Sequence, residues 1–152
     1  ASYLWLSSAL RCPVPLGPAA HDLALQLRLG EARARNRSDA ASARPGGDSH
    51  HLELTAVQEW TWARGAGNHT LQALAQWERV SDTDGYSPLL HSNEPRTVDR
   101  TTLGLTWTLP LPVGADRGWR AVIGAQQFRQ SANLQPFDLS GRIVQFGIER
   151  QW

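Results

Sequence analysis

The segment Asp82-Thr83-Asp84-Gly85 has the residue types and spacing with which a calcium-binding loop begins. A complete EF-hand loop needs further oxygen ligands and a bidentate glutamate at its twelfth position, where this chain has Asn93. Two other metal-ligand types, His50 and His51, are adjacent, so on a strand their imidazoles would point to opposite faces. We therefore expect a polar turn at the aspartates, a strand start at the histidines, and no metal site.

The residue types of a serine-hydrolase triad occur close together at Ser87, His91, Ser92 and Asp99. A triad is defined by the geometry of its side chains, and nearness in sequence does not supply that geometry. The chain also lacks the G-x-S-x-G nucleophile elbow. A polar loop accounts for these residues, so the sequence predicts no catalytic residue, no cofactor, and a protein that is not an enzyme.

The composition limits the class of protein that must position any such residues. The chain has 152 residues, enough for one domain with its own core and too few to expect two. Fifteen arginines, with no lysine, against fourteen acidic residues leave a formal charge of +1, which argues against nucleic-acid binding driven by bulk charge. The lone Cys12 cannot form an internal disulfide, and no apolar run of about 18 residues predicts a transmembrane helix.

Large apolar residues alternate with polar or small ones along most of the chain. This is the period of a strand that has one apolar and one polar face. In Leu103–Leu111, every odd position is large and apolar. The pattern predicts about seven antiparallel strands, most of them about 9 to 12 residues long. Their ranges are Ser2–Leu10, His21–Gly30, His51–Trp62, His69–Val80, Leu103–Leu111, Trp119–Arg129 and Arg142–Trp152.

The predicted connections differ in length in a regular order. Ala63–Asn68 and Pro112–Gly118 are short, whereas Glu31–Ser49 and Ser81–Arg100 are long and polar. Outer-membrane barrels have short periplasmic turns and longer extracellular loops, and a tilted strand needs roughly 9 to 11 residues to cross the hydrocarbon layer. The sequence therefore predicts an all-β, antiparallel up-and-down transmembrane β-barrel in the outer membrane of a Gram-negative bacterium. The alternative is a soluble β-sandwich that binds carbohydrate or protein.

A barrel in that membrane would contact lipid through its aromatic residues. Seven tryptophans in a chain of mean hydropathy −0.40 suit a lipid-facing stripe interleaved with a polar interior. Rings near strand ends lie at the membrane interfaces in such barrels. We expect this position for Trp5, Trp60, Trp62, Trp77 and Trp119.

The positions of the arginines suggest a further polar surface. Arg33, Arg35 and Arg37 occupy alternate positions, so on a strand they form one stripe. A forked guanidinium suits phosphate, so the stripe either lines the lumen or contacts lipopolysaccharide. Arg120, with Arg129 and Arg142, would add to a lumen of mixed charge that includes Glu53, Glu59, Glu78 and Glu149. The alternative is that these ion pairs only brace the barrel interior.

The C-terminal run ends in an aromatic residue preceded by alternating apolar ones. Val144, Phe146, Ile148 and Trp152 form this pattern, with Arg150 as its one departure. The run resembles the C-terminal sorting signal that the outer-membrane barrel assembly machinery recognises. That resemblance implies the machinery as a partner of this chain.

A second resemblance covers residues 69–152. It is carried by Gly85-Tyr86-Ser87-Pro88-Leu89-Leu90 and by Ser131-Ala132-Asn133-Leu134-Gln135-Pro136-Phe137-Asp138, each between predicted strands. The chain is similar to the C-terminal barrel of surface lipoprotein assembly modifiers and related outer-membrane proteins with periplasmic tetratricopeptide repeats. The resemblance implies a channel or translocation element that helps to export lipoproteins or other cargo. It also implies that residues 1–152 are the C-terminal portion of a larger barrel, as does the odd number of strands.

The sorting-signal hypothesis predicts a specific effect of deleting Trp152. A ring at a strand end is only partly buried, so its loss should cost little stability. We expect the deletion to lower strongly the amount of protein assembled in the outer membrane, measured by quantitative immunoblotting of membrane fractions. Purified protein should still refold in detergent. Unchanged amounts in the membrane would contradict the hypothesis.

Overall fold

The computed structural model describes residues 2–16, 19–33, 46–64, 67–87, 89, 93–112 and 118–150. These residues form strands, with a single 3₁₀ turn, η3 (Gln135–Phe137). The seven strands are β1 (Ser2–Leu16), β2 (Ala19–Arg33), β3 (Ser49–Arg64), β4 (Gly67–Gly85), β5 (Pro95–Pro110), β6 (Trp119–Ala132) and β7 (Leu139–Arg150). No helix in this part of the chain has the length and apolar character needed to cross a membrane.

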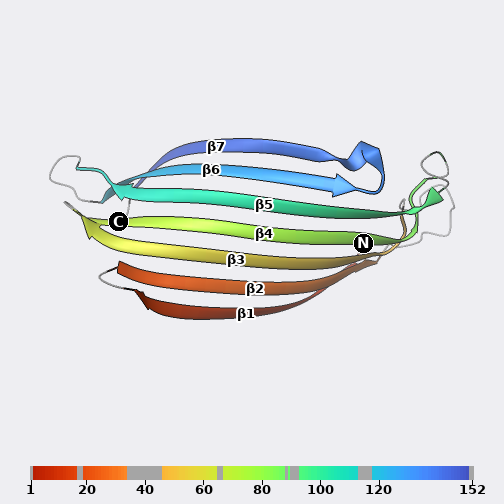
Figure 1. Cartoon of the computed structure of the whole chain (residues 1–152), viewed down its shortest axis with the longest axis horizontal. Helices are drawn as coiled ribbons and strands as arrows, with labels where there is room; N and C mark the ends of the chain where they lie inside the picture. Colours follow the sequence, from red (N-terminus) through yellow and green to blue (C-terminus); the bar gives the residue numbers. More distant parts are fainter. Residues whose placement is uncertain are drawn as a thin grey trace.

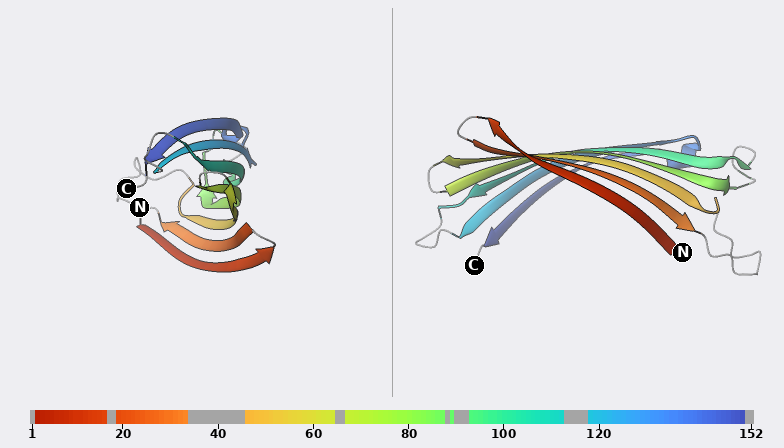
Figure 2. Two further views of the ribbon diagram at one scale, coloured as in Figure 1. Left: turned by 90° about the vertical axis from the view of Figure 1, so that its left-hand side faces the viewer. Right: turned by 90° about the horizontal axis from the view of Figure 1, so that it is seen from below.

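Each strand pairs antiparallel with the next one in sequence, in the order β1 to β7 (Figure 1). The predicted all-β, antiparallel up-and-down arrangement is therefore confirmed. The sheet curls into an open trough (Figure 2). Within the described residues β1 and β7 are its two edges and do not pair with each other, so the sheet is not closed.

The strands are longer than the alternation alone predicts, from the 12 residues of β7 to the 19 of β4. β1 continues through Pro13 and Pro15, and β5 begins at Pro95 and ends at Pro110. Proline cannot donate to a ladder, so it is tolerated at strand ends and on edge strands whose nitrogen faces outward. Pro13 and Pro15 are two residues apart on the edge strand, which puts both nitrogens on the same side of β1.

The connections only partly keep the predicted order of lengths. At one end of the sheet, residues 17–18 join β1 to β2 and residues 65–66 join β3 to β4. At the other end, residues 34–48 join β2 to β3 and residues 86–94 join β4 to β5. The last two links, 111–118 and 133–138, do not follow the rule, since the first of them is the longer. We call the two ends the short-turn end and the long-loop end.

The register assigns each side chain to one of two faces. Leu27, Leu54, Trp77 and Thr101 lie in one row across β2 to β5, and their immediate neighbours Gln26, Thr55, Gln76 and Thr102 form a row on the other face. Side chains on the second face are less exposed: Thr102 is 5% exposed and Leu103 is 57% exposed. Crowding of this kind is expected on the concave side of a curled sheet. We call this polar side the inner face and the apolar side the outer face.

Glycines give the inner face room for its larger side chains. Gly30, Gly104, Gly124, Gly141 and Gly147 all lie on that face by register. A Cβ at Gly30 would collide with the ring of Trp5, and one at Gly141 would collide with the ring of Phe128. Glycine at such positions lets a sheet bend tightly while neighbouring side chains cover the backbone.

The most buried side chains of the described residues gather toward the long-loop end. Arg96 Nε donates to Asp82 Oδ2 at 2.9 Å and Arg96 Nη2 to Asp82 Oδ1 at 3.3 Å, and the Asp82 side chain is only 1% exposed. The Arg96 guanidinium lies 4.9 Å from the ring centroids of both Tyr86 and Phe137, which meet edge to face at 4.8 Å. Leu134, nearby in the same link, is fully buried. We call these five residues the end cluster.

The expected turn at Asp82–Gly85 is wrong, because this segment continues β4. The ion pair of Asp82 with Arg96 and backbone hydrogen bonds hold it in place. Thr83 and Asp84 donate backbone hydrogen bonds to the carbonyls of Asp48 and Gly46. Gly46 has a φ of 83°, and a Cβ there would collide with the Asp82 carboxylate. A bulge between Ser81 and Gly85 adjusts the register before the chain turns toward β5.

Neutralising Asp82 should destabilise this end of the sheet. In Asp82→Asn the mostly buried Arg96 loses its counter-charge, and breaking a buried pair costs about 3 to 5 kcal/mol. The matched control is Asp99→Asn, which removes the exposed Arg79–Asp99 pair and should cost at most about 1 kcal/mol. The free energy of unfolding from urea titration checks both values, and amide exchange at Thr83 and Tyr86 checks the location. Equal losses in the two variants would contradict the assigned role of the end cluster.

Candidate functional site

The outer face carries a continuous apolar surface, which we call the outer band. Among the described residues of the strands, the exposed large apolar side chains lie on this face except Trp5, Leu139 and Ile143. The band comprises Leu4, Leu6, Leu10, Leu25, Leu27, Leu29, Leu54, Leu103, Leu105, Trp107, Ile123, Val144, Phe146 and Ile148. Its members lie on β1 to β3 and on β5 to β7, and between them β4 contributes the half-buried Leu71 and Trp77 to the same face.

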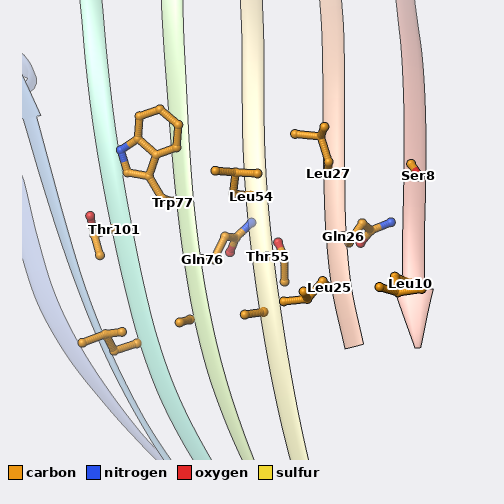
Figure 3. A pocket seen from close by; sticks show the side chains of 13 residues that line it. Ser8, Leu10, Leu25, Gln26, Leu27, Leu54, Thr55, Gln76, Trp77 and Thr101 are labelled. Atoms are coloured by element: carbon orange, nitrogen blue, oxygen red, sulfur yellow. The ribbon is translucent and has the colours of Figure 1, made fainter. Parts of the chain in front are cut away.

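A shallow hollow of about 560 Å³ lies in the outer band over β1 to β5. Leu10, Leu25, Leu27 and Leu54 project from three neighbouring strands along it, with Trp77 on β4 (Figure 3). Ser8 and Thr101 are the few polar side chains that contribute from the same face. The hollow is apolar and open, without the convergent polar groups that orient a small ligand.

Aromatic residues border the band at the short-turn end. Trp60, Trp62, Trp107 and Trp119 all lie on the outer face there. His69 stacks on Trp62 with centroids 5.6 Å apart and an interplanar angle of 17°, and it approaches Trp107 at 6.0 Å. The guanidinium of Arg150 lies 5.6 Å from the Trp119 ring. Three of the five expected interface aromatics, Trp60, Trp62 and Trp119, thus lie in one region, and Trp107 lies with them.

Charged residues border the band at the long-loop end. Arg79 donates to both carboxylate oxygens of Asp99, at 2.8 and 3.0 Å. Arg129 and Arg142 are exposed on the same face, in rows with Thr101 and Leu103 respectively. The expectation that Arg129 and Arg142 line a lumen is therefore wrong, because the register of β6 and β7 turns both of them outward.

The predicted arginine stripe begins on the outer face. Arg33 lies at the end of β2, and its guanidinium donates to both carboxylate oxygens of Glu31 at 3.0 and 3.3 Å. Arg35 and Arg37 lie outside the described residues. Arg120 lies on the inner face, directly opposite Glu149 in the β6–β7 register. Arg33 and Arg120 therefore lie on opposite faces of the sheet.

The inner face carries charges of both signs. One row across β2 to β6 consists of Arg28, Glu53, Glu78, Arg100 and Gln130. Arg28 is 3.8 Å from Glu53, and Arg100 donates to Gln130 Oε1 at 3.0 and 2.6 Å. The two adjacent glutamates are thus flanked by arginines. The face is suited to contact with water.

A second hollow, of about 290 Å³, lies at the long-loop end of this face. His51, Glu78, Arg96, Arg100 and Gln130 contribute its polar lining. His51 Nδ1 is 4.0 Å from Glu78, and its Nε2 is 2.9 Å from the Ser49 hydroxyl. Trp5, expected at the membrane interface, lies on this inner face with its ring edge-on to His51 at 5.4 Å.

The residues that suggested metal or hydrolase chemistry are not assembled into a site. Asp82 is held by Arg96, and Asp99 is held by Arg79. His91 and Ser92 lie outside the described residues. Within the part of the chain that the structure describes, no group of three or more His, Cys, Asp or Glu side chains could hold a metal ion.

The apolar residues of the expected sorting signal lie on one face of the edge strand β7. Phe146 is 77% exposed, and Val144 and Ile148 lie on either side of it. Trp77, the remaining expected interface aromatic, lies within the outer band in one row with Leu27 and Leu54, and 5.5 Å from the Arg79 guanidinium. Trp152 lies outside the described residues.

The two segments that carry the family resemblance meet in space. Tyr86 of the first and Phe137 of the second form the aromatic part of the end cluster. In the second, Asn133 donates to the Pro95 carbonyl, and the Asp138 carboxylate accepts from the Ala132 amide. The sequence did not predict the contact between Tyr86 and Phe137. The two residues are far apart in the chain, and the pairing of β5 with β6 brings their segments together. The chain matches no family model, no curated protein and no solved structure in the three comparisons made.

A pair of substitutions on β5 tests whether the outer band meets lipid. Leu105 lies on the outer face and Thr106 on the inner face. Arginine at a lipid-facing midplane position costs roughly 2 to 4 kcal/mol in a barrel. Leu105→Arg should therefore strongly reduce folding into liposomes, measured by protection from protease, whereas Thr106→Arg should be tolerated. Equal effects would contradict a lipid-facing outer band.

Proposed function

We propose that this chain forms part of the wall of an outer-membrane β-barrel, with the outer band against lipid and the inner face along a channel or translocation path. One observation carries the proposal. Most of the exposed large apolar side chains lie on one face of the sheet, on β1 to β3 and β5 to β7, and the opposite face is rich in Arg, Glu, Gln and Thr.

The number of exposed leucine, valine, isoleucine and aromatic side chains in the outer band favours contact with lipid. A soluble monomer rarely exposes a contiguous apolar patch of more than a few hundred square ångströms, because apolar surface in water is unfavourable. The borders of the band also suit a bilayer, since aromatic rings lie at one end and guanidiniums at the other. Tryptophan and arginine are both favourable at the level of lipid headgroups.

The backbone meets the requirement that a bilayer imposes. Hydrocarbon offers no hydrogen-bond partner, so every peptide group that crosses it must be paired within the protein. The register from β2 to β6 pairs each of these strands on both sides. β5 has 16 residues, more than the roughly 9 to 11 that a tilted strand needs to cross the hydrocarbon.

Closure of the barrel would need further strands. An odd number of strands in up-and-down order makes β1 and β7 point in the same direction. Direct pairing of the two edges would be parallel, and antiparallel closure takes at least one additional strand between them. This agrees with the hypothesis that the chain belongs to a larger barrel. The lipoprotein cargo that the family resemblance implies remains a prediction.

In the alternative, a soluble β-sandwich, the outer band would have another role. There the apolar face would be a core packed against a second sheet. The described residues form a single sheet, and the arginines at the end of its apolar face would border that core. The barrel is therefore the proposal that these features favour.

Extraction and labelling of cells that make the full-length protein test the proposal. The protein should remain with washed outer membranes and should dissolve only when detergent is added. In a Cys12→Ser background, a cysteine at Leu89, which is 93% exposed at the long-loop end, should react with a membrane-impermeant maleimide in intact cells. The matched control is a cysteine at Asn68, which is exposed near the short-turn end and should react only after lysis.

Each outcome has a separate meaning. Release of the protein without detergent would overturn the membrane proposal and favour the sandwich. Reaction at Asn68 but not at Leu89 in intact cells would leave the protein in the membrane but reverse its orientation.

A further inference from the structure

Arg129 and Arg142 lie side by side at the long-loop border of the outer band. Arg129 is directly opposite Ser140, and Arg142 is two residues further along β7, so the two arginines are diagonal neighbours. Side chains in this relation start only about 7 to 8 Å apart. Both arginines are exposed, and no carboxylate among the described residues forms an ion pair with either. Two like charges held this close favour binding of an anion between them.

The residues around the two guanidiniums are hydrogen-bond donors. Thr101 and Ser140 flank Arg129 in its row, and Gln127 is opposite Arg142. Two carboxylates are close to Arg129 in the register: Asp99, two residues before Thr101, and Asp138, two residues before Ser140. Arg79 already binds both oxygens of Asp99, and Asp138 accepts a hydrogen bond from the Ala132 amide. The patch is therefore positively charged, with hydroxyl and amide groups between the arginines. Guanidiniums and hydroxyls together suit the several oxygens of a phosphate group.

An apolar groove begins at this patch. It has a volume of about 320 Å³ and runs over β5, β6 and β7 on the outer face. Leu103, Leu105, Ala125 and Val144 form its apolar lining, and Gln127 and Arg142 lie at its polar end. The groove is apolar along its length and positively charged at one end. It therefore matches a lipid that has an apolar tail and a negative headgroup.

We infer that this patch and groove form a binding site for a phosphate-bearing lipid. The guanidiniums of Arg129 and Arg142 bind the phosphate, and an acyl chain lies along Leu103, Leu105 and Val144. The inference rests on the proposed function, since the groove opens to lipid only if the outer band lies in a bilayer. It adds a specific lipid contact at a defined place on the border.

The chemistry distinguishes this ligand from a free anion. Inorganic phosphate would satisfy the two guanidiniums but would leave the groove unfilled. A lipid without phosphate would fill the groove but would leave two adjacent positive charges without a counter-ion. Only a molecule with both parts uses the whole site.

The experiment measures lipid binding to the full-length protein in detergent micelles by native mass spectrometry. The probe is diphosphorylated lipid A, compared with the same lipid after its phosphates are removed. We expect the phosphorylated form to bind at least about tenfold more tightly, because charge-assisted hydrogen bonds to phosphate are strong. The double variant Arg129→Gln/Arg142→Gln should lose this preference.

Two further variants serve as controls. Arg28→Gln/Arg120→Gln removes the same charge from the inner face and should leave lipid binding unchanged. Ala125→Trp should weaken lipid A binding by filling the groove while both arginines remain. Circular dichroism checks that each variant retains its strands.

Several outcomes would overturn the inference. These are equal binding of the two lipid forms, unchanged binding by the Arg129/Arg142 variant, or complete displacement of lipid A by excess inorganic phosphate. Folding of the unmodified protein into phosphatidylcholine vesicles is measured in parallel. If the protein folds there without a phosphate preference, only the lipid site is wrong; if it does not fold into any bilayer, the proposed function is wrong as well.

Discussion

Strict alternation of side chains along paired strands is the constraint on which the rest of this structure depends. A shift of one residue in any register would move a whole set of leucines to the inner face and a set of charges to the outer face. The rows that cross the sheet keep the two sets apart over its central part, and the outer charges Arg79, Asp99 and Arg129 lie toward the long-loop end.

The long-loop end is built in a different way. There the described residues form a compact region in which Asp82, Arg96 and the rings of Tyr86 and Phe137 contact one another. An ion pair that is nearly removed from water must keep exact geometry, because either charge alone would be costly. The pair therefore fixes how β4 and β5 leave the sheet.

Much of the fold follows from the sequence, because period-two alternation is a local property. The strand number, the antiparallel order and the separation of Leu105 from Thr106 are all confirmed. The sequence predicts less well the features that depend on contacts between segments far apart in the chain. Asp82 looked like a turn residue because its partner Arg96 is on another strand, and the outward position of Arg129 and Arg142 depends on registers that the alternation of one strand cannot supply. The meeting of Tyr86 with Phe137 is also invisible in sequence, since no period or spacing links them.

The prolines of β1 make the two edge strands differ in how well a further strand can pair with them. An incoming strand must find a free donor at every second residue of the edge on which it docks. Beside β7 the ladder from Leu139 to Arg150 contains no proline, so it can guide a new strand along its whole length. Beside β1 two donors are missing in succession at Pro13 and Pro15, near the short-turn end. A strand that pairs with β1 must therefore form its first hydrogen bonds near the long-loop end. Addition of a strand beside β7 has no such restriction.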